Sequence, residues 1–192
     1  MNQELIGMTV VGILLSGLIA FAGTSLKPDY STDMKELRDK FNQDKGKVRL
    51  ILLLSPTCPY CIDGASIVQK KVLSQIKDKD VRVYSVWVPI LQNDAESVVP
   101  EAKKKLSDQR VSHYWDGKGE LSKSYTDLLH LKHVSTGELV PAWDIYMIFP
   151  RDAEWRDVPP TPSYWMHQLP LGEERRLNGD TLTIEVKKLL QR

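Results

Sequence analysis

The chain has 192 residues, of which 42% are hydrophobic and 27% are charged, and its formal net charge is +1. This length and hydrophobic content suffice for a core within one domain, and the near-neutral charge gives no indication of a nucleic-acid partner. The two cysteines, Cys58 and Cys61, are too close in sequence to form the disulfide framework of a small secreted domain. Stability must therefore come from the core.

Residues 5–26 contain no charged side chain, which separates them from the rest of the chain. A helix of that length rises about 1.5 Å per residue and matches a hydrocarbon core of roughly 30 Å. We predict that residues 1–26 are a transmembrane anchor or a signal peptide, and that 27–192 form one domain. The leading MNQE has no Lys or Arg, as the n-region of a signal peptide would, so the anchor is favoured. The basic residues that follow would favour a cytoplasmic domain under the positive-inside rule.

The remaining chain alternates between helical and strand patterns. The run VRLILLL is typical of a strand that is buried on both faces. Helices are expected from residue 31 or 32 to Gly46, from Pro59 to Ile76, and over 93–106, 120–131 and 183–190. Strands are expected over 48–54, 81–88, 111–115 and 142–149, with a further edge strand over 163–169. This order predicts an α/β fold in which helices cover both faces of a mixed sheet.

Cys58 and Cys61 occur in the sequence SPTCPYC, where the first long strand ends and a helix begins. Unpaired N–H groups and the positive end of the helix dipole favour a thiolate at Cys58, and Pro59 suits the first helical turn. Cys61 follows one turn later and is expected to be more buried. Disulfide exchange needs one thiol that attacks and a second that resolves the mixed disulfide, so we assign these roles to Cys58 and Cys61 respectively.

The element order, SPTCPYC and the later ELVPAW together resemble the thioredoxin-like superfamily over about residues 31 to 192. The resemblance implies a thioredoxin-like fold with a cis-proline at Pro141, beside the cysteines. It also implies that Val140 offers its backbone to a substrate segment. Pro59 and Tyr60, inside the motif, are expected to contact substrate as well. An ordinary proline at the start of a strand is the alternative for Pro141.

Two departures from that family limit the resemblance. Thioredoxin has a buried acid six residues before its first cysteine, where this chain has Leu52, so Cys61 is expected to lack its usual proton acceptor. The Gly-Gly pair of glutaredoxins is absent, which argues against glutathione. Zinc is disfavoured because no second Cys-x-x-Cys or Cys-His pair supplies further ligands, whereas copper bound by the two thiols stays open.

These patterns predict a thiol:disulfide oxidoreductase that is tethered to a membrane in an extracytoplasmic space. Its partners would be protein thiols or disulfides and a redox partner that the sequence does not identify; no cofactor, metal or nucleic acid is expected. Export is favoured because disulfides persist in oxidising compartments, and a chain with no further cysteines is not harmed by oxidising conditions. The alternative is a thioredoxin-fold metal carrier or partner-binding module that is not an enzyme.

Overall fold

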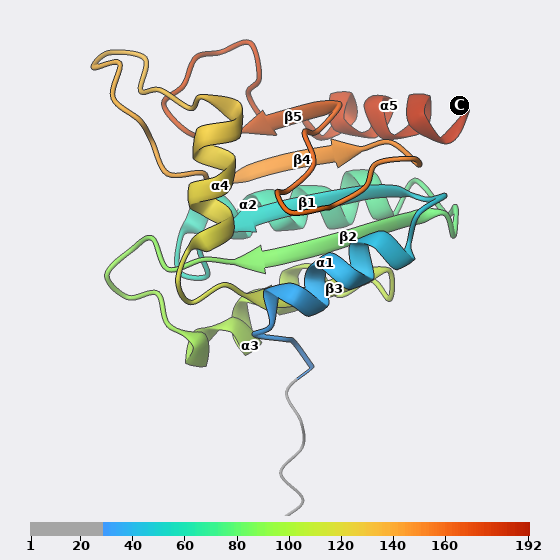
Figure 1. Ribbon diagram of the computed structural model, residues 1–192, viewed down its shortest axis with the longest axis horizontal. Helices are drawn as coiled ribbons and strands as arrows, with labels where there is room; N and C mark the ends of the chain where they lie inside the picture. The colour runs from blue at the N-terminus through green and yellow to red at the C-terminus, as the bar shows by residue number, and fades with distance from the viewer. Residues whose placement is uncertain (1–28) are drawn as a thin grey trace, which may run out of the picture.

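The computed structural model describes residues 29–192, which contain a five-stranded sheet of order β3-β2-β1-β4-β5 (Figure 1). The strands β1 and β2 pair in parallel, as do β2 and β3, whereas β4 runs antiparallel to both β1 and β5. Their bounds are Val48–Leu54 for β1, Val81–Trp87 for β2, Val111–Trp115 for β3, Ile145–Phe149 for β4 and Tyr164–His167 for β5. The mixed α/β sheet predicted from the sequence is confirmed.

Helices cover both faces of the sheet. Every residue of the central strand β1 is buried as a result. On one face Leu50 and Leu52 pack with α2, α3 and α5, and on the other Ile51 and Leu53 pack with α1 and α4. In Figure 1, α1 and α4 cross in front of the sheet while α2 and α5 lie behind it. The helices span Met34–Gln43 (α1), Pro59–Ile67 (α2), Val99–Ala102 (α3), Glu120–Leu129 (α4) and Gly179–Leu190 (α5). The two covered faces agree with the fold that was predicted from the sequence.

Two predicted helices differ from the structure. The expected helix over 93–106 is broken into the 3-10 turn η2 (Glu96–Val98), the short α3 and a second 3-10 turn η3 (Lys103–Lys105). Asp94 does not cap a helix here, because its carboxylate accepts hydrogen bonds from the loop before Cys58 instead. The helix that starts at Pro59 continues beyond α2 as the π-helical segment η1 (Val68–Leu73).

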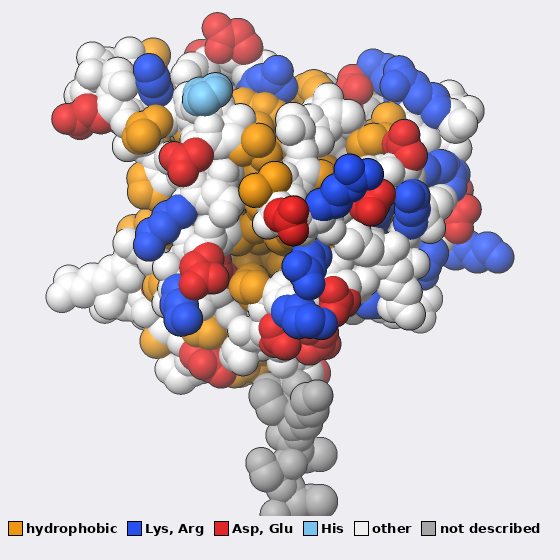
Figure 2. Space-filling view, in the orientation of Figure 1, with side chains coloured by type: hydrophobic (Ala, Val, Ile, Leu, Met, Phe, Trp, Pro, Cys, Tyr) orange, Lys and Arg blue, Asp and Glu red, His pale blue; other side chains and the backbone are white. Residues whose placement is uncertain are grey.

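The predicted membrane segment, residues 1–26, lies outside the described residues. Among the helices of residues 29–192, none is both long and apolar enough to cross a bilayer. On the face that carries α1 and α4, Lys and Arg side chains alternate with Asp and Glu (Figure 2). No broad patch of one charge is visible on that face.

Candidate active site

The two cysteines lie at the carboxyl end of β1, at the start of α2. After Leu54, residues 55–57 turn the chain so that Cys58 is the N-cap of α2 and Pro59 occupies its first turn. Both side chains are free thiols; Cys58 is 3% exposed and Cys61 is fully buried. The backbone carbonyl of Cys58 accepts a hydrogen bond from the Ile62 N–H, which begins the helix. The structure thus places the predicted nucleophile at a helix N-terminus and the predicted resolving thiol one turn inside it.

Cys61 lies in surroundings that favour its protonated form. Burial, together with the negative charge of Asp144, raises the pKa of the Cys61 thiol far above its ordinary value. The Ser55 N–H donates to the Cys61 Sγ at 3.3 Å and opposes this effect in part. Cys61 can therefore attack a mixed disulfide only if a nearby group takes its proton.

Asp144 is the functional residue that the sequence did not predict. It directly precedes β4 and is 2% exposed, and its φ of 51° lies in the left-handed region that Asp adopts more readily than most residues. One carboxylate oxygen of Asp144 accepts hydrogen bonds from the Tyr146 hydroxyl at 2.6 Å and the Gln168 side-chain amide at 2.9 Å. An oxygen of this carboxylate also lies within 4.8 Å of the Cys61 sulfur. A buried acid therefore stands near the predicted resolving thiol, although it comes from the residue before β4 and not from the strand that leads to the cysteines.

Burial raises the pKa of the Asp144 carboxyl, although the hydrogen bonds from Tyr146 and Gln168 act against that rise. A carboxyl of this kind accepts a proton at higher pH than an exposed one does. The only sequence signal for it is a single charged residue directly before the hydrophobic run IYMIF. We predicted that run to start at Ala142, which placed Asp144 inside a strand.

Gly64 allows Tyr146 to reach Asp144. A Cβ atom on Gly64 would overlap the Tyr146 hydroxyl and would lie 2.6 Å from the ring carbon that bears it. The side-chain nitrogen of Gln168 would lie 3.0 Å from this added Cβ. The same nitrogen donates a hydrogen bond to the Tyr60 carbonyl at 2.8 Å. The helix that carries the cysteines is thus tied to β4 through a contact that only glycine permits.

Asp94 fixes the turn before Cys58 from the other side. Its Oδ1 accepts from the Ser55 hydroxyl, the Thr57 hydroxyl and the Thr57 N–H, at 3.0, 2.6 and 3.1 Å. Its Oδ2 accepts from the N–H groups of Ile90 and Leu91 at 2.9 and 2.7 Å. Burial alone would raise the pKa of Asp94, but these hydrogen bonds outweigh it and lower the pKa below its ordinary value. The carboxylate thereby holds the loop after β2 against the turn that positions Cys58.

The predicted cis-proline is wrong. No peptide bond within residues 29–192 is cis, and Pro141 is exposed and lies four positions before β4 begins. The Val140 N–H donates to the Leu131 carbonyl at 2.9 Å, and its carbonyl accepts from the Thr126 hydroxyl at 3.2 Å. The predicted strand began at residue 142, directly after Pro141, whereas β4 begins at Ile145. Asp144, and not Pro141, is therefore the residue that precedes the strand.

Pro59 and Tyr60, the other two predicted substrate contacts, lie on the surface next to Cys58. Both side chains are exposed, and that of Tyr60 is 69% exposed. The structure therefore brings Cys58, Cys61, Pro59 and Tyr60 together, whereas Val140 and Pro141 belong to a separate segment. Cys58, Cys61 and Asp144 also offer ligand atoms that all lie within 4.8 Å of one another.

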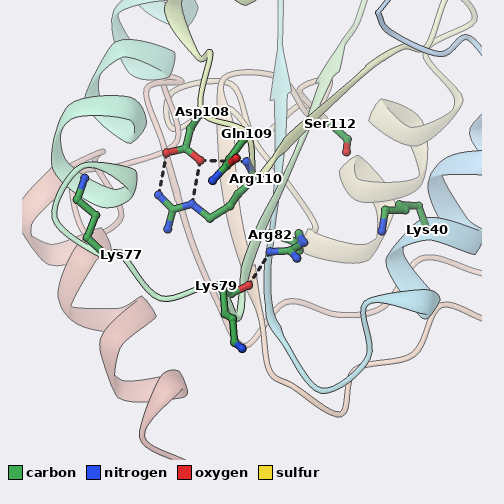
Figure 3. A pocket seen from close by; sticks show the side chains of 8 residues that line it. All are labelled: Lys40, Lys77, Lys79, Arg82, Asp108, Gln109, Arg110 and Ser112. Atoms are coloured by element: carbon green, nitrogen blue, oxygen red, sulfur yellow. Dashed lines mark hydrogen bonds and ion pairs between the residues drawn. The ribbon is translucent and has the colours of Figure 1, made fainter.

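A basic cavity of about 590 Å³ lies at the opposite ends of the parallel strands (Figure 3). Apart from Lys40 of α1, its lining residues precede or begin the strands β2 and β3, whereas the cysteines follow the end of β1. Several of its cations already have partners: Arg110 pairs with Asp108 at 2.8 Å, and Arg82 donates to the Lys79 carbonyl at 2.6 Å. This cavity is separate from the cysteines and adds no group to their site.

No family model matches the sequence, and no curated protein matches it significantly. The fold is similar to solved structures of low sequence identity. One is a secreted Mycobacterium tuberculosis disulfide oxidoreductase homologous to E. coli DsbE, with 12% identity and a TM-score of 0.47 over 77% of this chain and 85% of that one. Another is the thioredoxin domain of a Bacteroides vulgatus thiol-disulfide oxidoreductase, with 16% identity and a TM-score of 0.44 over 77% and 83%. A thioredoxin-like protein in its oxidised form is 18% identical, with a TM-score of 0.47 over 76% and 78%. Similarity at this level assigns no activity, which must be inferred from the site itself.

Proposed function

We propose that this chain is a thiol:disulfide oxidoreductase that acts on protein thiols through Cys58 and Cys61. The observation that carries the proposal is the convergence of three groups: a thiol at a helix N-terminus, a buried thiol one turn later, and a buried carboxyl beside the second thiol. Each group matches one step of disulfide exchange.

In the reductive direction, the Cys58 thiolate attacks one sulfur of a substrate disulfide. A mixed disulfide forms and the other substrate sulfur leaves as a thiolate. The Cys61 thiol then loses its proton and attacks the Cys58 sulfur, which releases the second substrate thiolate and leaves a Cys58–Cys61 disulfide. Two electrons pass from the protein to the substrate. A redox partner that supplies a dithiol restores the enzyme, and the same steps in reverse oxidise a substrate dithiol.

Asp144 is the proton acceptor in the second step. Its carboxylate lies within 4.8 Å of the Cys61 sulfur, and burial raises the pKa of the carboxyl above its ordinary value, which makes it a better proton acceptor. The position that holds an acid in thioredoxin is Leu52 here, and its side chain is fully buried in the core. The buried acid of this chain thus comes from the segment that opens β4.

Substrate contacts are proposed at Pro59 and Tyr60, whose exposed side chains flank Cys58. Trp143 precedes Asp144, and within residues 29–192 its main chain has no hydrogen-bond partner. An extended substrate segment is proposed to pair with that main chain, one residue before Asp144, whose carboxylate lies within 4.8 Å of the cysteine sulfurs. Val140 and Pro141 are the other substrate contacts that we predicted, and both backbone groups of Val140 are already hydrogen-bonded within the fold.

The proposed location is an extracytoplasmic membrane surface, with residues 1–26 as the anchor. Its support is the charge-free run of residues 5–26 and the lack of any cysteine outside the redox pair. Deletion of residues 1–26 should release a folded, redox-active domain from membranes. A truncated chain that still sediments with membranes would contradict this assignment of the anchor.

Reduction of insulin by dithiothreitol tests the activity. The wild-type chain should accelerate precipitation of the insulin B chain catalytically, and Cys58→Ser should abolish the acceleration. Asp63→Asn is a matched control, since Asp63 is exposed and lies two positions after Cys61. A wild-type protein that binds metal stoichiometrically but shows no turnover would favour the carrier alternative.

A further inference from the structure

The reduced site also has the composition of a metal centre. The sulfur atoms of Cys58 and Cys61 and a carboxylate oxygen of Asp144 lie within 4.8 Å of one another, and all three residues are buried. Within residues 29–192, no other three His, Cys, Asp or Glu side chains converge in this way. The ligand atoms come from two elements, the start of α2 and the residue before β4.

The Asp144 carboxylate is held in place by the groups around it. Its Oδ1 accepts from the Tyr146 hydroxyl and the Gln168 amide, at 2.6 and 2.9 Å. Carboxylates that bind metals are commonly oriented by such outer hydrogen bonds. Because both donors use Oδ1, Oδ2 accepts no hydrogen bond among residues 29–192 and keeps its lone pairs for a ligand. The Gly64 contact with Tyr146 supports this orientation, since the ring packs directly against the helix that carries the cysteines.

The donor set discriminates between metals. Two thiolates alone suit Cu(I), which needs no oxygen ligand. A carboxylate oxygen added to two sulfurs suits Zn²⁺, which accepts Cys and Asp ligands together in tetrahedral geometry. Three anionic ligands exceed the charge of the ion by one, and three protein ligands leave a fourth coordination position for water or another small ligand.

We propose that the reduced protein binds one Zn²⁺ through Cys58, Cys61 and Asp144. A Cys58–Cys61 disulfide removes both thiolate ligands, so the oxidised protein does not bind the ion. Zinc bound to Cys58 also occupies the lone pair with which that sulfur would attack a disulfide. Zinc and disulfide exchange therefore compete for one site, and zinc release accompanies oxidation.

The test uses the full chain, with Co²⁺ as a spectroscopic probe and Zn²⁺ as its competitor. The protein reduced with a phosphine should bind one Co²⁺ with sulfur-to-cobalt charge-transfer absorption, and Zn²⁺ should abolish that absorption. The oxidised protein should bind neither ion. Asp144→Asn should weaken zinc binding at least tenfold, whereas the exposed neighbour Asp63→Asn should bind as the wild type does. Equal affinity in wild type and Asp144→Asn would overturn the proposal, because the dithiol alone would then account for binding.

X-ray absorption of the wild-type zinc protein tests the ligand set without any variant. We expect two sulfur ligands at about 2.3 Å and oxygen ligands at about 2.0–2.2 Å. Four sulfur ligands would indicate a site shared between two chains and would contradict the proposal. This test is separable from that of the proposed function. Turnover of insulin without zinc binding would refute only the zinc site, and zinc binding without turnover would refute only the enzymatic activity.

Discussion

Replacing Gly64 by alanine tests whether the helix of the cysteines packs against Tyr146 as described. The added methyl group would overlap the Tyr146 hydroxyl and approach its ring carbon to 2.6 Å. Tyr146 is fully buried, so it cannot swing into solvent to relieve the contact. Overpacking of this kind costs about 1–3 kcal/mol, and the upper end applies where the neighbour is fixed. Alanine regains about 1 kcal/mol over glycine within a helix. The expected net loss is therefore about 2 kcal/mol.

Urea unfolding of Gly64→Ala, Tyr146→Phe and the double variant measures this cost and its origin. Tyr146→Phe removes the oxygen that the methyl group would overlap, so the two substitutions should be non-additive by more than about 0.5 kcal/mol. The double variant should be more stable than the sum of the single losses predicts. Ser66→Ala, on the same helix, controls for a general effect of alanine there. If Gly64→Ala were neutral or stabilising in the wild-type background, the packing of Tyr146 on α2 would be refuted.

Three further predictions concern stability. Asp44→Asn should cost about 2 kcal/mol at neutral pH, because hydrogen bonds led by that from Lys40 outweigh burial and lower the Asp44 pKa from 3.8 to about 2. This contribution is complete above about pH 4 and is lost as the pH falls through about 2, so acid unfolding curves of wild type and variant should converge there. Burial lowers the pKa of His113 to about 4, so folding stability should fall by about 3 kcal/mol as the pH drops from about 6.5 to 4, and His113→Gln should lose this dependence. Asp94→Ala should cost about 2–3 kcal/mol in urea unfolding, since it leaves the N–H groups of Thr57 and the loop after β2 without their acceptor; a loss below about 0.5 kcal/mol would contradict that role.

The strands and the cysteine pair could be predicted because their signals are local. An unbroken aliphatic run such as VRLILLL has no stable place except between two covered faces, and β1 has the predicted bounds. In the same way, a proline after a cysteine at the end of a strand marks the first turn of a helix, and α2 begins at Pro59.

Asp144 could not be predicted because its role depends on contacts that are distant in sequence. Its partners are Cys61 on α2 and Gln168 beyond β5, and no spacing rule connects them. Pro141 was misassigned for a related reason. A proline before a hydrophobic run is equally consistent with a strand opening and with a loop, and the left-handed turn at Asp144 decides where the strand starts. Asp94 lies at the start of the helix that we predicted over 93–106, but its carboxylate binds the turn before Cys58 instead.

Trapping of mixed disulfides tests the central assignment most directly. Cys61→Ser removes the thiol that resolves the intermediate, so incubation with a disulfide-bonded protein substrate should accumulate a covalent complex through Cys58, visible on non-reducing gels and lost on reduction. Cys58→Ser should form no such complex, because the remaining thiol is fully buried and burial raises its pKa. The account predicts a complex with Cys61→Ser alone. A complex that forms through Cys61 in the Cys58→Ser chain, and not in the other, would contradict it.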